Sequence, residues 1–322
     1  MEDKKSIITE KDVLILKQLL EDGRKSSASI SKEIDLGREI VNYRIKRLIK
    51  ENLIVKFVPK INEKAFNYQE YIILLKLNLD DELSKEQFIR EHIGNKYLIW
   101  TIKSESGWDL IVRLYASSMI EFKEKLAEIL ENFSSVLASY YTIISSEEIK
   151  ENEKEIISKN LFNDPIETKD FEIIKTQERE IPQLDDKDKE IIKLLEEDAR
   201  IQYKEIAENL NISSDTVKYR IDKMRNQGII ENFTPVINLT RLGFYQYAAI
   251  AKFNYLNKDE EEKIRKYVEA NVNINKTIKS LSSEEYFMTL IFDNKEEIED
   301  FVQEFKIEFA KTLVNIDYFT IE

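Results

Sequence analysis

Cysteine is absent from the 322-residue chain, histidine occurs once, and glycine and proline are scarce. Without cysteine the protein has no disulfide, no thiolate metal site and no cysteine nucleophile. With His92 as the only histidine, two-histidine metal sites and HExxH zinc motifs are excluded. His92 ends a predicted helix just before Gly94, where a cation suits the helix dipole better than it suits catalysis. The six glycines form no phosphate-binding loop, so we expect no metal, no cofactor and no enzyme activity.

Long hydrophobic runs are also missing. No apolar stretch approaches the roughly 18 residues of a membrane span. The charged start Met1–Lys5 lacks the hydrophobic region of a signal peptide, so we expect a cytoplasmic protein with no membrane association. The 49 basic and 62 acidic residues give a net charge of −13, which argues against a general polyanion binder. A negative net charge of the whole chain does not exclude a basic face on one of its modules.

The sequence is written twice. Residues match without a gap at a constant spacing of 176, the difference between 188 and 12. Because the match runs through loops as well as helices, it predicts a duplication. The matching segments include Asp12 with Asp188, Glu21–Arg24 with Glu197–Arg200, Val41–Ile45 with Val217–Ile221, and Phe57–Asn62 with Phe233–Asn238.

Each copy divides into two modules. The first has the helical spacing of three short amphipathic helices, followed by a short strand pair at Leu53–Val58 and Ile229–Thr234. Three helices and a hairpin describe a winged helix-turn-helix. The second module reads strand, helix, strand, strand, helix, strand, which is the ferredoxin-like βαββαβ pattern. We therefore predict an α+β chain with winged helix-turn-helix modules at 1–62 and 184–240, βαββαβ modules at 63–146 and 241–322, and a charged connector at 147–183 that begins with a helix over Glu147–Lys159.

The third helix of a winged helix-turn-helix enters the DNA major groove. In the first copy Val41, Ile45 and Leu48 form its buried stripe, so the opposite face carries residues that suit phosphates and base edges. The predicted DNA-binding residues are Arg38, Asn42, Tyr43, Arg44, Lys46, Arg47 and Lys50, and in the second copy Ser214, Lys218, Tyr219, Arg220 and Lys223. The alternative is an ordinary solvated, charged helix face.

The local charge differs between the copies. Residues 9–62 hold 12 basic and 8 acidic side chains, whereas residues 184–238 hold 9 basic and 12 acidic ones. In the second copy the third helix should begin at Ser213 or Ser214, with a capping hydroxyl where the first copy has Gly37. Asp215 and Asp222 share its face. Because carboxylates repel phosphates, we expect weaker DNA contact from this copy.

The strands of the βαββαβ modules are apolar on both faces. Tyr71, Ile73 and Leu75 share one face, while Ile72 and Leu74 point the other way. Helices cover only one face of such a sheet, and an exposed apolar face marks an association surface. The second copy of the same module is the simplest partner, either within one chain or between chains.

This module order resembles the Lrp/AsnC (feast/famine, leucine-responsive) family of transcription regulators. The resemblance rests on Lys187–Arg200, Ser213–Ile221 and Gly228–Ile230, and with the βαββαβ (RAM-type) modules it spans nearly the whole chain. It implies double-stranded DNA as partner, self-association through the sheets and a small amino-acid-like effector. In the family the effector binds near a Gly-x-Asp turn, which the first copy keeps at Gly107 and Asp109. The second copy has Ser283–Tyr286 at this place, without the glycine. The alternative for Gly107 and Asp109 is that they form a simple tight turn and bind no effector.

Two rival functions remain open. One is a protein-binding adaptor of the transcription machinery whose winged helices do not read DNA. The other is an enzyme, because siroheme decarboxylases resemble the same two-module architecture, although they use histidine and basic side chains and this chain has one histidine. The aspartates Asp185, Asp186 and Asp188 could suggest a metal cluster, but their position before a helix is better explained by capping.

Overall fold

A computed structural model of the chain describes residues 8–66, 68–79, 84, 87, 88, 98–101, 108–151 and 183–321. The described residues fall into two compact units, and each unit draws on both copies of the repeat. One unit contains those of 1–67 and 157–243, and the other contains those of 68–156 and 244–322. None of the described helices is long and apolar enough to cross a bilayer.

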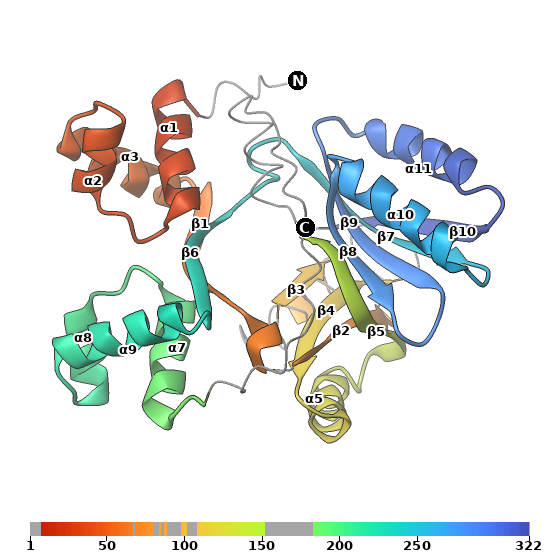
Figure 1. Cartoon of the computed structure of the whole chain (residues 1–322), viewed down its shortest axis with the longest axis horizontal. Coiled ribbons are helices and arrows are strands. Elements are labelled where there is room, and N and C mark those ends of the chain that lie inside the picture. Colours follow the sequence, from red (N-terminus) through yellow and green to blue (C-terminus); the bar gives the residue numbers. More distant parts are fainter. Residues whose placement is uncertain are drawn as a thin grey trace. The chain divides into compact units, whose positions relative to one another are not determined.

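The first unit holds the two helix-turn-helix modules (Figure 1). Its elements are α1 (Glu10–Glu21), α2 (Ser27–Glu33), α3 (Arg38–Lys50), β1 (Ile54–Ile61) and the short 3₁₀ helix η2 (Glu63–Phe66), then α7 (Asp186–Glu197), α8 (Tyr203–Leu210), α9 (Ser214–Asn226) and β6 (Ile230–Ile237). The predicted stripe Val41, Ile45 and Leu48 is buried, as predicted. The expected N-cap of α9 is also present, since Ser213 accepts a hydrogen bond from the backbone N–H of Thr216.

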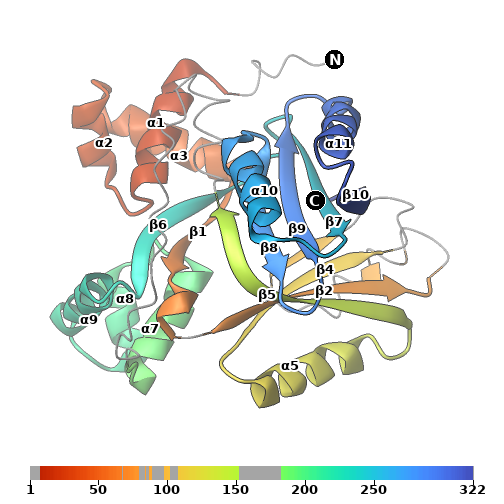
Figure 2. The same ribbon diagram turned by 45° about the vertical axis from the view of Figure 1, so that its right-hand side comes forward.

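Within the first unit, β1 and β6 pair with each other. They form one antiparallel two-stranded ribbon, so each copy contributes a single strand and the expected hairpin is shared between the copies (Figures 1 and 2). The physical reason is that β1 is followed by η2 and not by a second strand of the same copy. The backbone N–H and C=O groups of β1 therefore form their hydrogen bonds with a strand of the other copy.

The second unit holds both βαββαβ modules in one antiparallel sheet of the order β10-β7-β9-β8-β5-β2-β4-β3. Its elements are β2 (Gln69–Leu77), β3 (Leu98–Thr101), β4 (Leu110–Ala116), α5 (Met119–Asn132), β5 (Leu137–Glu151), β7 (Tyr245–Phe253), α10 (Lys258–Ala270), β8 (Ile274–Ser280), β9 (Glu285–Phe292), α11 (Glu297–Glu308) and β10 (Leu313–Thr320). The second copy shows the complete βαββαβ order predicted from the sequence, and the described elements of the first copy follow it except for the first helix, most of which lies outside the described residues. His92 lies outside the described residues.

The second unit has three buried clusters. Phe122 and Ile129 of α5 pack on one face of the first-copy strands, on the side of Tyr71 and Ile73. α10 and α11 pack in the same way on the second-copy strands. The third cluster joins the opposite faces of the two copies and contains Ile72, Leu74, Ile111, Ile143, Ala248, Ile278, Phe287, Phe319 and Ile321. The apolar second face seen in the sequence is thus buried against the other copy.

Strand β5 is longer than the sequence indicates. Its first half pairs with β2, and its second half, Ser145–Glu151, pairs with β8 of the other copy (Figure 2). The helix expected from Glu147 onward is therefore wrong as far as Glu151, and residues 152–159 lie outside the described part of the chain. Tertiary partners override the local helical pattern here, because Ile149 and Lys150 are buried against the second copy.

Candidate nucleic-acid interface

The first-copy recognition helix α3 presents a polar, partly basic face to solvent. Arg38, Lys46 and Lys50 are exposed, Asn42 is half-buried, and Tyr43 is 68% exposed. Glu39 and Ile40 are also exposed near the start of the helix. These side chains come from the helix positions that face away from the buried stripe, so they are available to a duplex.

Arg44 and Arg47, which the sequence also assigned to DNA, turn toward α1. Their guanidinium groups lie 2.9 and 2.6 Å from the two carboxylate oxygens of Asp12, which is fully buried. Asp12 also accepts a hydrogen bond of 2.8 Å from the backbone N–H of Thr9 at the start of α1. The two arginines therefore join α3 to α1, and this places their charge at the edge of the recognition face rather than at its centre.

The second-copy recognition helix α9 differs in its charges. Ser214, Lys218, Tyr219 and Lys223 are exposed, but so are Asp215 and Asp222. Arg220 is half-buried and binds Asp188 of α7 and Asp185, the residue just before α7, each at 2.7 Å. These hydrogen bonds raise the pKa of Arg220. Asp185 caps α7, as the sequence indicated, and the described residues contain no cluster of three metal-ligating side chains.

The register of the β1–β6 ribbon defines a local two-fold relation between the copies. Val58 pairs with Thr234, and these two residues occupy equivalent positions 176 residues apart. On either side the pairs exchange roles: Phe57 lies opposite Pro235, and Pro59 lies opposite Phe233. An antiparallel ribbon with this register relates its two strands by rotation. α3 and α9 therefore belong to one paired body rather than to two independent modules.

The repeated Glu-Asp-Gly/Ala-Arg segment holds this pair together, a role that the sequence showed only as part of the repeat. The backbone N–H groups of Gly23 and Ala199 donate to Phe233 and Phe57 at 2.7 and 2.9 Å. At Gly23 an added Cβ would lie 3.0 Å from the backbone of Phe233, so the approach is close.

The arginine that follows each of these residues crosses to the other copy. Arg24 and Arg200 donate to the carbonyls of Ile201 and Lys25, each at 3.0 Å. Their guanidinium groups lie over the Phe233 and Phe57 rings, with centroid distances of 5.4 and 4.9 Å. Burial lowers the pKa of both arginines, although a guanidinium stays charged at neutral pH. The charged guanidinium groups of Arg24 and Arg200 therefore bind the other copy of the repeat.

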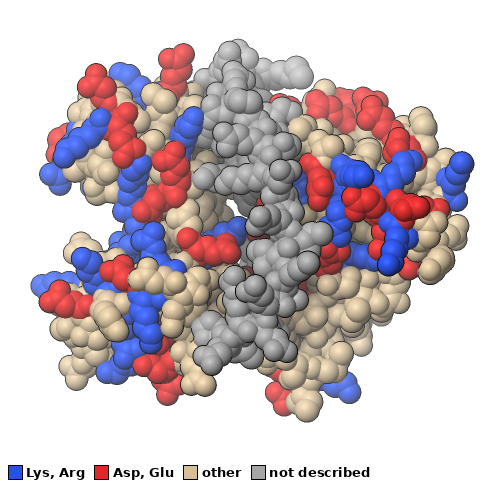
Figure 3. Space-filling view, in the orientation of Figure 1, with Lys and Arg blue, Asp and Glu red and all other residues tan. Residues whose placement is uncertain are grey.

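Basic and acidic side chains are mixed on the face of the two helix-turn-helix modules that Figure 3 shows. Adjacent red and blue side chains on this face are consistent with the balanced charge counts of the two modules. On this face, therefore, any attraction for DNA must come from a restricted set of residues, and not from a uniformly basic surface.

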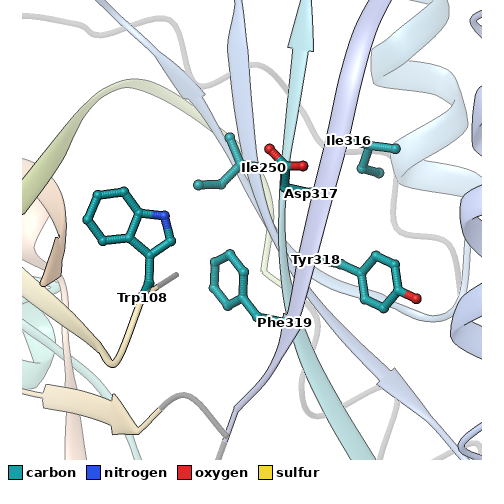
Figure 4. Close-up of a pocket in the computed structure, with 6 residues that line it drawn as sticks. All are labelled: Trp108, Ile250, Ile316, Asp317, Tyr318 and Phe319. Carbon is teal, nitrogen blue, oxygen red and sulfur yellow. The ribbon is translucent and has the colours of Figure 1, made fainter. Parts of the chain in front are cut away.

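A second candidate site is a cavity of about 270 Å³ in the second unit. It is lined by Trp108, Ile250, Ile316, Asp317, Tyr318 and Phe319 (Figure 4). Trp108 and Phe319 come from different copies and face each other in this view. The predicted effector residue Asp109 follows Trp108, but its carboxylate accepts a hydrogen bond of 2.7 Å from the Leu77 backbone N–H. This contact favours the alternative of a simple tight turn, in which the Asp109 carboxylate binds the backbone rather than an effector. Gly107 lies outside the described residues.

The comparisons with known proteins agree with this architecture. A family model described as winged helix-turn-helix DNA-binding matches residues 8–55 and 184–231, which are equivalent segments of the two copies. An uncharacterised HTH-type transcriptional regulator of Pyrococcus abyssi is 30% identical over 147 residues, which are 45% of this chain and 97% of that protein. Another, from Pyrococcus furiosus, is 29% identical over 142 residues, 44% of this chain and 93% of that protein.

Among solved structures, a siroheme decarboxylase is similar over 97% of this chain and 90% of its own, with a TM-score of 0.60 and 14% identity. At this identity the likeness concerns the fold. It extends through both copies.

Both copies match the winged helix-turn-helix DNA-binding model, and the HTH-type transcriptional regulators similar to this chain are covered over nearly their whole length, so the chain is a helix-turn-helix transcription regulator with DNA as its partner. Within that class, the chain belongs to the Lrp/AsnC family and is a tandem form of it.

Proposed function

We propose that this protein is a sequence-specific transcription regulator in which one chain acts as a pseudo-dimer. The observation that carries the proposal is the two-fold register of β1 and β6, because it couples two recognition helices in one polypeptide. In dimeric helix-turn-helix proteins such a pair contacts two half-sites about one helical turn of DNA apart. The family's dimer of two chains would here be replaced by two copies in one chain.

The binding energy would come from phosphate neutralisation, and the specificity from a few side chains that reach base edges. Arg38 and Lys46 suit guanine, Asn42 suits adenine, and Tyr43 offers an exposed ring and hydroxyl. Arg44, Arg47 and Arg220 would act from the flanks while they remain paired with the aspartates of α1 and α7. We propose no catalytic group, metal or cofactor.

Replacing Arg38 or Lys46 with alanine should weaken binding to the protein's own promoter site by about 1–3 kcal/mol. The affinity is measured by fluorescence anisotropy across a series of salt concentrations, where it should fall steeply with the logarithm of salt. Lys306→Ala, which removes an exposed lysine of α11, is the control and should leave the affinity unchanged. If neither α3 variant alters the affinity, the recognition assignment is wrong. If the unaltered protein binds no DNA at low salt, the adaptor function is favoured.

A catalytic function receives support from one observation, the full-length fold likeness to a siroheme decarboxylase. The side chains favour the regulator. The cavity that Figure 4 shows is lined by apolar groups, a tyrosine and one carboxylate, with no basic side chain among its six residues. A tetrapyrrole carries several carboxylates, and Asp317 would repel them.

The same cavity suits a small amino-acid-like effector, with its ammonium group toward Asp317 and its side chain against Trp108 and Phe319. We expect such a ligand to change the fluorescence of Trp108, measured in a Trp100→Phe background that leaves one tryptophan. Amino acids and an iron tetrapyrrole are titrated in parallel, and Asp317→Asn should weaken the amino-acid response. A tetrapyrrole that binds with a Soret shift, while no amino acid responds, would favour the enzyme over the regulator.

A further inference from the structure

The two recognition helices, α3 and α9, have the same length and the same anchoring contacts, but they carry different side chains on their outward faces. Equivalent positions on α3 and α9 are 176 residues apart, and their buried stripes are nearly the same: Val41 and Val217, Ile45 and Ile221, Leu48 and Met224. Both helices run for 13 residues. Each is anchored to the first helix of its own copy through an arginine, Arg44 or Arg220, that binds a buried aspartate. The scaffold of the pair is therefore symmetric.

The outward faces do not follow this symmetry. Arg38 corresponds to Ser214, Asn42 to Lys218, Lys46 to Asp222 and Lys50 to Asn226. The shared outward residue is Tyr43, which corresponds to Tyr219, and both are 68% exposed. At the exposed position 46/222 a positive charge in one copy is replaced by a negative charge in the other. These differences fall on side chains that reach base edges in a helix-turn-helix.

Base recognition depends on matching donors and acceptors, so two helices whose outward side chains differ in charge and in hydrogen-bonding groups favour different sequences. Lysine and arginine donate to the guanine edge, whereas aspartate accepts from the cytosine amino group and is repelled by phosphate. A homodimer must present two identical reading helices, and its two-fold symmetry makes its operator palindromic. A duplicated chain is free of this constraint, because each copy carries its own sequence.

We propose that the chain recognises an asymmetric operator, a duplex with two half-sites of different sequence, and therefore binds it in one orientation. α3 takes the half-site that contributes most of the affinity, and α9 takes a second half-site of weaker contribution. Asp222 opposes the binding of a copy of the first half-site at the second position. This inference rests on the proposed DNA-binding function and deepens it by naming the class of DNA.

The test starts with selection of bound sequences from a random duplex library by the full-length protein, followed by footprinting. We expect two dissimilar half-sites about one helical turn apart. The selected site is then compared with a palindrome of its stronger half. The unaltered protein should bind the palindrome about tenfold or more weakly than the selected site. The triple variant Ser214→Arg, Lys218→Asn, Asp222→Lys gives α9 the α3 residues at three positions and should reverse this preference.

Each other outcome is decisive. A palindromic consensus, or a footprint limited to one half-site, overturns the asymmetric operator while DNA binding itself stands. The absence of any selected sequence at low salt overturns the DNA-binding function, and the inference with it. The matched control is Lys204→Ala, an exposed α8 residue outside both reading faces, which should keep the preference of the unaltered protein. Circular dichroism of the triple variant verifies that α9 still folds.

Discussion

Replacing Asp12 with alanine should lower the free energy of unfolding of the first unit by about 3–5 kcal/mol. Asp12 is fully buried, and it holds Arg44 at 2.9 Å and Arg47 at 2.6 Å while it also binds the backbone N–H of Thr9. Its loss leaves two guanidinium groups without their buried partner and removes the carboxylate that caps the start of α1. Asp188→Ala should cost less, because Asp188 binds one arginine and Lys223 replaces the second.

The loss of stability in the Asp12→Ala variant is measured by chemical denaturation. Hydrogen exchange of α1 and α3 shows where in the first unit the loss occurs. Glu10→Ala is the control, since Glu10 lies in the same helical turn and is exposed. A loss as small as that of the control would contradict the anchoring role of Asp12. DNA affinity should also fall in the Asp12 variant, because α3 is then no longer fixed to α1.

The Asp12 contribution should depend on pH. Burial alone would raise the pKa of this carboxyl, but hydrogen bonds from Thr9 and Arg44 and the charge of Arg47 bring it below its ordinary value. A carboxyl with a lowered pKa in the folded state stabilises fully above its unfolded pKa of about 4, and the stabilisation disappears as the pH falls through the folded-state pKa. The gap in stability between the unaltered protein and the Asp12 variant should therefore narrow below about pH 4.

Replacing Lys276 with methionine should destabilise the second unit by a similar amount, about 3–5 kcal/mol. The Lys276 ammonium is buried between β8 and β5 and lies 2.7 Å from Glu148, 3.2 Å from Glu70 and 3.6 Å from Glu151. Glu148 and Glu151 belong to the part of β5 that crosses to the second copy. Without the ammonium, Glu148 would lose its contact with Lys276, and Glu70 and Glu151 would share the guanidinium of Arg113.

Lys266→Met is the matched control for this prediction. Lys266 is 73% exposed and pairs with Glu262 on the same helix at 3.6 Å, a contact worth about 0–1 kcal/mol. Hydrogen exchange should show faster exchange in β5 and β8 of the Lys276 variant and unaltered exchange in the Lys266 variant. If the amides of β8 exchange as slowly in the Lys276 variant as in the unaltered protein, the prediction is wrong. The backbone pairing of β5 with β8 and the apolar cluster then hold the two copies together without Lys276.

Periodicity and repetition predicted most of the fold. The buried stripes of α3 and α9, the βαββαβ order and the two apolar faces of β2 follow from local spacing, which each segment carries within itself. The capping of α7 and α9 also follows from short-range chemistry, because Asp185 and Ser213 stand directly before helical residues. The exposed residues of α3, such as Tyr43 and Lys46, were predictable as the complement of the buried stripe.

Long-range partners could not be predicted in the same way. Arg44 and Arg47 have the composition of a DNA-binding face, and only their proximity to the buried Asp12 shows that they join two helices. Ser145–Glu151 has a charged, helix-compatible sequence, but β8 supplies the backbone partners that make it a strand. The sequence showed Arg24 and Arg200 as equivalent residues of the repeat. Only the structure showed that the carbonyl groups they bind lie in the other copy.

The amino-acid sequence by itself determined the duplication, the module order and the residues exposed on the recognition helices, because these depend on spacings within one segment. The tertiary structure alone decided that β1 pairs with β6, that β5 continues into the second copy, and which arginines are held by aspartates. These features depend on hydrogen-bond partners and counter-charges about 30 to 180 residues away along the chain, and local propensity carries no information about such partners.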